Sequence, residues 1–596
     1  MTTENKKKMI PITIDGLKIE VEEGSTIVEA ASHVGVRIPT LCHHPDLSIP
    51  GACRVCVVDV KDRGHYMAAC SVKVWEGMEV ETNSLQIRQT RRDIVELILD
   101  NHDKDCQTCE RSGNCELQNL ANEMGIRERL FEGARKNLHE DHTSCAVVRN
   151  PNKCILCGRC IRVCSETQAI NNLSQHGRGF TTVVAPAHEA DMDDSACIQC
   201  GQCVTVCPTA ALLEKDDTEA VWAALSDPKK HVVVQTAPAI RATIGEGFGM
   251  APGTPSTGRM VAALRRLGFD AVFDTNFGAD LTIVEESTEF LQRLEGKGPL
   301  PMFTSCSPGW INYLERFHPS MIPHASSCKS PMTMTSALLK TYYAEQKGID
   351  PHDVYVVAIM PCVAKKYEAK RSEHTLPDGT PYTDAVLTTR ELIWMIKSYG
   401  VDYWTTGSID LENYPRDTFD NPLGTSSGAG DIFGTTGGVM EATLRTAVEK
   451  LSDGRINQID FHEVRSVDGI RESVVEVNGK KIVVAVVNGL SNAAKVLAEV
   501  AAGKEYHLIE FMACPGGCIG GGGQPYPPKG MKPRDPELLW LRAKALYMID
   551  AGKTLRRSHE NPAISKLYMD YLGAPGSEKA QKLLHTNYSA RLPRGI

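Results

Sequence analysis

The chain has 596 residues, 42% of them hydrophobic and 23% charged, which predicts a multi-domain globular protein with at least one large core. Its net charge of −9 is mild and no long Lys/Arg run occurs, which argues against a general nucleic-acid binder. We find no apolar stretch of the roughly 18 residues that a membrane span needs and no signal-peptide pattern, so we expect a cytoplasmic protein. In such a reducing compartment, 21 cysteines predict metal or cluster sites rather than disulfides.

The first cysteine group follows a segment, residues 10–30, that alternates apolar and polar side chains like a short strand pair, with turns at Asp15-Gly16 and Glu23-Gly24. A thiolate quartet from one loop and a later strand suits a 2Fe–2S cluster, with a structural zinc site as the alternative. We assign residues 1–84 to this domain, with the ligands Cys42, Cys53, Cys56 and Cys70.

The second group begins after a predicted helix over residues 85–100. One imidazole and three thiolates can hold a 4Fe–4S cluster, because neutral imidazole can replace a thiolate. A lone histidine near a helix end is more often a cap or a surface residue, but the cysteines that follow favour a ligand. We assign residues 85–144 to this domain, with the ligands His102, Cys106, Cys109 and Cys115.

The third group is an internal repeat in which the run C-x2-C-x2-C-x3-C occurs twice, 43 residues apart, within residues 145–218. This is the spacing of a bacterial two-cluster ferredoxin, in which the fourth cysteine of each run binds the other cluster. One 4Fe–4S cluster should therefore use Cys154, Cys157, Cys160 and Cys207, and the other Cys197, Cys200, Cys203 and Cys164. Cys145 lies outside the motifs and is predicted to be a buried structural thiol.

From about His231 the cysteines become sparse, and the runs at 232–235, 354–360, 481–487 and 506–512 have the composition of buried strands. Helix-length segments separate them, which predicts an α/β domain over 225–575, with 576–596 as a C-terminal tail. Cysteine motifs follow such strands, where α/β sheets bind ligands. Their spacing alone predicts only another shared metal site. The motifs are TSCSPGW (304–310), MPCVAKKYE (360–368) and EFMACPGGCIGGGGQP (510–525).

These three motifs, in this order, resemble the segments that hold the six-iron H-cluster of iron-only (FeFe) hydrogenases. The resemblance covers nearly the whole chain, including FDTNFGADLTIVEE (273–286) and SHENPAISKLY (558–568). The run HHPDLSIPGACRVC resembles the 2Fe–2S domain of FeFe hydrogenases and also that of complex I. It implies an α/β H-cluster domain preceded by small α+β iron–sulfur domains. The implied cofactors are one 2Fe–2S cluster, three accessory 4Fe–4S clusters, and an H-cluster made of a 4Fe–4S cubane and a diiron unit with CO, cyanide and azadithiolate.

Residue by residue, the resemblance implies that Cys362, Cys514 and Cys518 bind the cubane, and that Cys518 also bridges to the diiron unit. Lys365 would donate a hydrogen bond to a cyanide. The residues that would pack against the diiron unit or line its pocket are Met360, Met512, Pro238 and Ser305.

The family's proton path also maps onto this sequence. Cys306 would exchange protons with the azadithiolate amine, Glu286, Ser326 and Glu289 would relay them outward, and Arg293 would sit at the mouth. Glu286 and Glu289 are three residues apart on a predicted helix and share a face. A solvated helix face is the plain alternative, but the match of the whole segment favours the relay.

One position departs from the family pattern Thr-Ser-Cys-Cys-Pro, whose second cysteine is the fourth cubane ligand. This chain has Ser307 there, and a serine oxygen is a harder and weaker ligand for this iron than a thiolate. Ser307 could still bind, Cys306 could shift into the ligand role, or Cys328 could reach in, although a buried structural thiol is the stronger interpretation of Cys328. We favour Cys306 as the thiolate nearest the cluster, without choosing between the ligand role and the proton-transfer role.

Three functions remain open: a hydrogenase that interconverts H2 with protons and electrons, an electron-transfer subunit like that of complex I, and an H2-sensing or cluster-assembly relative. The three C-terminal motifs favour the hydrogenase. We find no G-x-G-x-x-G after a strand, so flavin or NAD(P) would bind to partner subunits. The domain set resembles NAD(P)-linked, often electron-bifurcating hydrogenases, although a monomeric ferredoxin-linked enzyme has the same set. Expected partners are H2, protons, ferredoxin, such subunits and maturation proteins, without nucleic acid or membrane.

Overall fold

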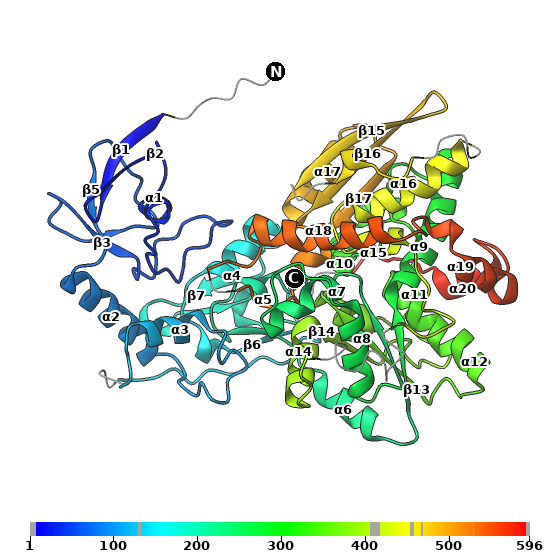
Figure 1. Cartoon of the computed structure of the whole chain (residues 1–596), viewed down its shortest axis with the longest axis horizontal. Helices are drawn as coiled ribbons and strands as arrows, with labels where there is room; N and C mark the ends of the chain where they lie inside the picture. Colours follow the sequence, from blue (N-terminus) through cyan, green and yellow to red (C-terminus); the bar gives the residue numbers. More distant parts are fainter. Residues whose placement is uncertain are drawn as a thin grey trace.

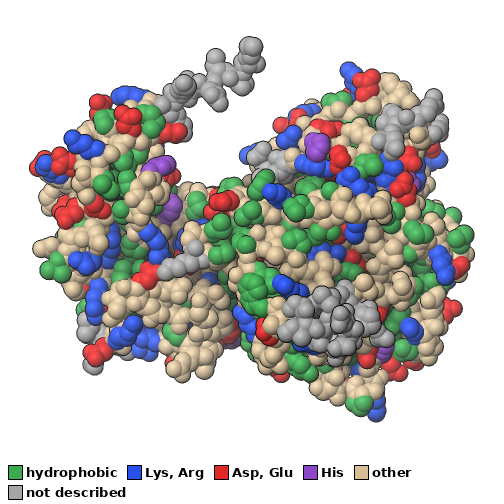
Figure 2. Space-filling model, in the orientation of Figure 1, with side chains coloured by type: hydrophobic (Ala, Val, Ile, Leu, Met, Phe, Trp, Pro, Cys, Tyr) green, Lys and Arg blue, Asp and Glu red, His purple; other side chains and the backbone are tan. Residues whose placement is uncertain are grey.

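The computed structural model describes residues 8–591 except 129–130, 132, 406–417, 453, 455–457, 466–468 and 529. In Figure 1 the cysteine-rich first part of the chain, blue to cyan, lies at one end, and the larger α/β part, green to red, lies at the other. Within the described ranges, no helix has both the length and the apolar character needed to cross a membrane. On the face shown in Figure 2, basic and acidic side chains are mixed.

The N-terminal sheet has the strand order β2-β1-β5-β3-β4. The predicted strand pair is confirmed: β1 (Met9–Ile14) and β2 (Leu17–Glu22) are antiparallel. Asp15 and Gly16 between them both have positive φ, 48° and 82°, as a two-residue hairpin turn requires. The remaining elements are β3 (Val57–Val60), β4 (Met67–Ala68), β5 (Glu79–Glu81) and the helix α1 (Ile27–His33), whose apolar face is buried.

Two helices and a small repeated unit follow. The predicted helix is confirmed as α2 (Leu85–Asp100), capped by Ser84, and it contacts α3 (Glu116–Glu123). In the repeat, Gly158 before α4 (Arg159–Arg162) and Gly201 before α5 (Gln202–Val206) both have left-handed φ, 68° and 71°. The sequence repeat is therefore also a repeat of backbone conformation. Its ends are joined by β6 (Val147–Arg149) and β9 (Leu212–Glu214), which pair antiparallel.

The α/β part contains two four-stranded sheets. In one, β11 (Ala271–Asp274), β10 (His231–Thr236), β13 (Val354–Met360) and β14 (Ala385–Thr388) are all parallel. The other has the order β12-β17-β16-β15, and only its β15–β16 pair is antiparallel. Its strands are β12 (Met302–Phe303), β15 (Ile470–Val477), β16 (Lys480–Asn488) and β17 (Leu508–Met512). All four predicted strands are present, although β17 starts two residues later than expected.

A buried helix, α9 (Thr275–Leu294), runs between the sheets and contacts α11 (Pro331–Leu338), α15 (Gly428–Ile432) and α16 (Gly438–Leu451). Most of its side chains are buried, polar ones included, because neighbouring elements cover it on several sides (Figure 1). The other long helices are α8 (Thr257–Arg266), α10 (Pro308–Phe317), α14 (Thr389–Ser398), α17 (Leu490–Ala501) and α18 (Pro536–Gly552).

The last described segment is not a loose tail. Helix α20 (Glu578–Leu584) contacts α11 and buries Ala580 and Leu584 completely. His585 then forms a β-bridge with Cys328. The segment 576–591, which we predicted as a tail, is therefore packed against the core through its few buried side chains, because the apolar face of α20 meets a helix some 250 positions earlier.

Candidate active site and metal centres

The four thiols of the N-terminal sheet domain lie in one group. Cys42 hydrogen-bonds with Cys53 and Cys70, and Cys56 with Cys70. Hydrogen bonds from Cys53 and Cys70 lower the pKa of Cys42 to about 2. A quartet this close fits a shared 2Fe–2S cluster or a zinc ion, since both need converging thiolates.

His102 is buried, and burial lowers its pKa to about 4, so its imidazole is neutral at physiological pH. It hydrogen-bonds to the backbone of Lys153, while its Nδ1 has no partner among the described atoms. A neutral imidazole with one nitrogen fixed and the other free is the form that binds a metal. Burial raises the pKa of both Cys106 and Cys115, and Cys109 adds a smaller electrostatic effect on each, which places the three thiols near one another.

The cysteines of the repeat line two separate cavities. The first cavity contains Cys154, Cys157, Cys160 and Cys207, and the second contains Cys164, Cys197, Cys200 and Cys203. Each cavity therefore gathers three thiols from one run and the fourth from the other run. This is the crossed grouping that the spacing predicts, and the cluster assignment itself stays a prediction.

A largely apolar cavity lies where the strands of both sheets end. Pro238 follows β10, Cys306 follows β12, Cys362 follows β13 and Cys514 follows β17, because parallel strands deliver their carboxyl ends to one edge. The predicted site residues that line it are Pro238, Cys306, Ser307, Met360, Cys362, Lys365, Met512, Cys514 and Cys518.

The buried thiols in this cavity are held in the protonated form. Burial raises the pKa of Cys518 to about 12 and raises that of Cys362, and it takes the pKa values of Cys514 and Cys306 well above 9. Such thiols become thiolates only when a cation replaces their protons. Three cysteines converging on a largely apolar cavity therefore fit an iron–sulfur group.

Lys365 is the cation of the cavity. Its Nζ donates to Glu368 Oε2 at 2.7 Å, to Ser330 Oγ at 2.8 Å and to the carbonyl of Cys306 at 3.2 Å. Glu368 in turn accepts from Thr333 Oγ1. This anchoring fixes the ammonium group at the cavity wall, where it can donate to a bound anion.

The three candidates for the fourth ligand of the cubane lie in different places. Ser307 and Cys306 line the cavity, and Ser307 Oγ accepts from the backbone N–H of Ala513 at 3.2 Å, next to Cys514. Cys328 is not among the lining residues; its thiol lies near Glu289 and His585. The cavity wall does not include Ser305 either, whose hydroxyl donates to the carbonyl of Cys328 at 2.7 Å.

A line of polar groups runs outward from Cys306 along α9. Glu286 is completely buried, and burial together with the nearby Glu289 raises its pKa to about 8. Glu286 hydrogen-bonds with Ser326, whose hydroxyl donates to Glu289 Oε2 at 3.0 Å, and Glu289 forms an ion pair with Arg293 at 2.5 Å. Ser326, Glu289 and Arg293 are therefore connected, Glu286 lies beside Ser326, and Cys306 is close enough for Glu286 to influence its pKa electrostatically.

Two groups near this series were missed from the sequence. Glu510, in the middle of β17, accepts from the backbone N–H groups of Gly437 and Met440, and burial raises its pKa to about 7. A glutamate inside a buried apolar strand was the available signal. His585 gave no signal, because its contacts lie some 250 residues away in the sequence.

The second repeat cavity lies next to the strand-end cavity. Gln168 donates to the carbonyl of Ala513 at 2.9 Å, and Gln202 donates to that of Gly520 at 3.2 Å. A Cβ on Gly309 would lie 3.6 Å from the Cβ of Cys200. Groups bound in the two cavities would therefore be neighbours, as electron transfer between them requires.

The fold and these cavities define an iron–sulfur metalloenzyme with accessory cluster domains. Family models match the chain in five segments. They are a 2Fe-2S iron-sulfur cluster binding domain (7–85), the NADH-ubiquinone oxidoreductase-G iron-sulfur binding region (91–129), a 4Fe-4S dicluster domain (153–211), the iron only hydrogenase large subunit, C-terminal domain (230–522) and the iron hydrogenase small subunit (536–591).

The chain is 48% identical to the NADP-reducing hydrogenase subunit HndD of Solidesulfovibrio fructosivorans, over 98% of this chain and 99% of that protein. It is 41% identical to iron hydrogenase 1 of Clostridium pasteurianum, over 97% and 100%. The solved apo [FeFe]-hydrogenase HydA1 from Chlamydomonas reinhardtii matches 63% of this chain and 99% of its own, with 44% identity and a TM-score of 0.54.

The chain belongs to the iron-only (FeFe) hydrogenase family. It is a hydrogenase with N-terminal iron–sulfur domains that relay electrons, so the predicted enzyme class is confirmed. The predicted fold class is confirmed as well, as are the kinds of cofactor domain: 2Fe–2S, 4Fe–4S and H-cluster. The number of clusters stays a prediction.

Proposed function

We propose that this chain is the catalytic subunit of an NAD(P)-linked, multi-subunit FeFe hydrogenase that couples H2 to ferredoxin and to a flavin- or NAD(P)-binding partner. The observation that carries this is the end-to-end match to a subunit of an NADP-reducing hydrogenase. A ferredoxin-linked enzyme acting alone is the second candidate, favoured by the equally complete match to iron hydrogenase 1. The cytoplasmic location stays a prediction that rests on the reducing environment the thiols need.

In this proposal Cys362, Cys514 and Cys518 would hold the cubane of the H-cluster, and Cys518 would also serve the diiron unit. When bound, the H-cluster supplies the redox-active iron at which H2 is formed or split. Lys365, fixed by Glu368, would donate to a cyanide of the diiron unit. Met360, Met512 and Pro238 would exclude water around it, which would strengthen the electrostatic contacts inside.

At the fourth corner of the cubane, the choice lies between Ser307 and Cys306, since both line the cavity. We propose that Ser307 binds this corner through its oxygen, which leaves Cys306, the nearest thiol, free to exchange protons. Cys328 is set aside as a ligand because it lies outside the lining.

Proton movement is assigned to the polar series on α9. Cys306 would hold the proton nearest the cofactor, Glu286 would take it, and Ser326 would pass it to Glu289. The pKa of about 8 suits Glu286 for this task, since a group that titrates near the working pH can both accept and donate.

Electrons would pass from each accessory cluster to the neighbouring one. Arg162 Nη2 donates to the carbonyls of Cys42 (2.7 Å) and Cys157 (3.3 Å), and Arg111 donates to that of Cys207 at 3.0 Å. The 2Fe–2S and His-ligated domains thus both dock on the first repeat cavity. Electrons from both domains would converge at this cavity. They would then pass to the second repeat cavity and arrive beside Cys514.

The test is to purify the native complex after co-expression with maturation proteins and to measure H2-driven NAD(P)⁺ reduction with and without ferredoxin. We expect partner subunits to co-purify and NAD(P)⁺ to be reduced. A single-subunit enzyme that is fully active with ferredoxin alone would establish the second candidate instead.

A further inference from the structure

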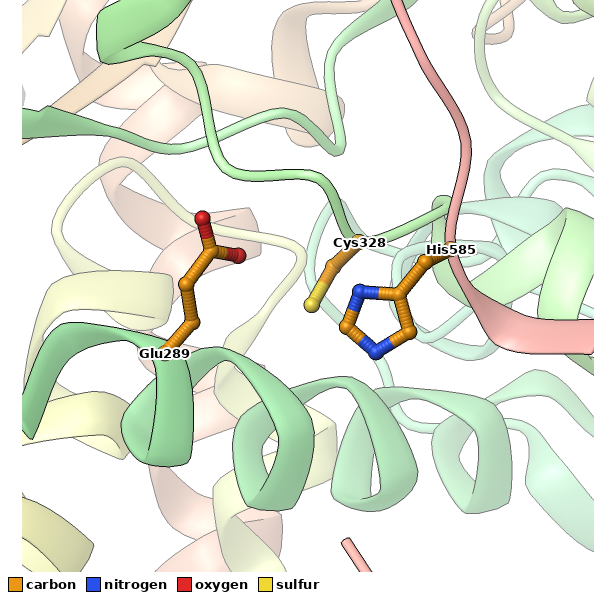
Figure 3. A group of neighbouring side chains, drawn as sticks. All are labelled: Glu289, Cys328 and His585. Carbon is orange, nitrogen blue, oxygen red and sulfur yellow. The ribbon is translucent and has the colours of Figure 1, made fainter. Parts of the chain in front are cut away.

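Glu289, Cys328 and His585 point toward one another from three distant parts of the chain (Figure 3). One ligating atom from each lies within 4.8 Å of the others. Such a group could bind a metal ion or could form part of a hydrogen-bonded proton relay. The hydrogen bonds around it decide between the two.

The polar atoms of this group already have partners. Glu289 Oε1 accepts from Arg293, and its Oε2 accepts from Ser326 Oγ, Ser327 N and Ser327 Oγ at 3.0, 3.0 and 3.1 Å. His585 Nδ1 lies 2.8 Å from Ser327 Oγ, and its Nε2 lies 3.1 Å from Glu285 Oε2. A metal ion would have to break several of these bonds. A continuous chain of hydroxyl, imidazole and carboxyl groups is instead what proton transfer uses.

Arg293 is unsuited to be the outer end of the path. Its guanidinium donates to Glu289 and to four backbone carbonyls, those of Pro299, Pro323, His324 and Ala325. A guanidinium stays protonated in proteins and so cannot pass a proton on. Arg293 therefore positions Glu289 and does not itself pass the proton on.

The backbone fixes His585 beside Glu289. Thr586 N–H donates to the carbonyl of Ser327 and Lys329 N–H to that of Leu584, both at 2.8 Å, on either side of the bridge between Cys328 and His585. A polar cavity of about 270 Å³ lies alongside, and Glu285, Glu289, Ser327 and His585 are among its lining residues. It has room for several water molecules.

We propose that Ser327, His585 and Glu285 form an outer branch of the proton path, which carries protons from Glu289 to Glu285 along the wall of this cavity; the inference rests on the proton path proposed above. A proton leaves the Glu289 carboxyl for Ser327 Oγ as the hydroxyl proton of Ser327 passes to His585 Nδ1. The Nε2 proton of His585 then passes to Glu285. The net change is one proton moved from Glu289 to Glu285, with no change in oxidation state.

The test compares wild type, His585→Gln and Ser327→Ala, each as the matured full-length enzyme with its CO and cyanide infrared bands checked. We expect H2 evolution to fall about tenfold or more in both variants, with an altered pH profile and a larger solvent isotope effect. Imidazole added to His585→Ala should restore activity, because the vacated site adjoins the cavity. The matched control is His559→Gln, which removes another carboxylate-paired imidazole, the partner of Glu449.

Wild-type rate, pH profile and isotope effect in both His585→Gln and Ser327→Ala, with intact infrared bands, would overturn the inference. So would one tightly held zinc ion per chain that is lost in His585→Gln, since that would make the group a metal site. Failure of the proposed function shows differently, as a wild type without H2 activity or infrared bands.

Discussion

At the scale of single residues, Ser307 replaces the thiolate that the family uses as the fourth cubane ligand. Its Oγ contacts the backbone beside Cys514. If the oxygen binds iron, Ser307→Cys should raise the midpoint potential of the cubane, because thiolate stabilises the oxidised iron less than the harder alkoxide does. A redox titration followed by EPR measures this. An unchanged potential, with a shift in Cys306→Ser instead, would assign the corner to Cys306.

Glu286 gives a prediction about pH. Burial raises its pKa to about 8, so the carboxyl is protonated below pH 8 and loses its proton as the pH rises through that value. Proton delivery for H2 evolution should therefore decline above pH 8. Glu286→Gln, which cannot relay a proton, should lower the rate about 100-fold or more with the H-cluster still in place. Glu286→Asp is the control that keeps the carboxyl. A Gln variant with the wild-type rate would contradict the assignment.

At the scale of elements, the contact between α5 and the loop after β13 joins the dicluster repeat to the active site. Gly201 has φ 71°, and a Cβ there would lie 2.6 Å from Val363 Cβ. Its repeat counterpart Gly158 has φ 68° but nothing within 4 Å. Gly201→Ala should therefore destabilise the folded state more than Gly158→Ala does, by an overpacking cost of about 1–3 kcal/mol. The melting temperature of Gly201→Ala should accordingly be the lower of the two. Equal shifts would show that only backbone strain matters.

Helix α20 belongs to the catalytic core rather than to a tail. Leu584 at its end is completely buried. Leu584→Ala should lower the free energy of unfolding by about 2–5 kcal/mol, since it leaves a cavity against α11. The exposed Lys582→Ala, on the same helix, should have little effect. Thermal unfolding of the loaded enzyme compares the two, and a neutral Leu584→Ala would mean that the helix is loosely attached.

At the scale of the whole molecule, cysteine spacing and apolar runs predicted the features that depend on residues close together in the sequence. The repeat of four-cysteine runs predicted the crossed grouping of Cys164 and Cys207, and apolar runs predicted the strands that end at the site. The place of His585 could not be predicted, because a bridge to Cys328 depends on how α20 folds back and leaves no periodic trace in the sequence. For the same reason the sequence could not separate Cys328 from Ser307 and Cys306 as ligands. That distinction needs the cavity lining.

The central claim is that the strand-end cavity holds a diiron unit beside a cubane. Infrared spectroscopy of the protein co-expressed with its maturation proteins tests it most directly, because few protein groups absorb where iron-bound CO and cyanide do. We predict both sets of bands in the wild type and their loss in Cys518→Ala, which removes the thiolate that we propose as the bridge. A fully matured wild-type protein that contains its accessory clusters but shows neither CO nor cyanide bands would contradict the account.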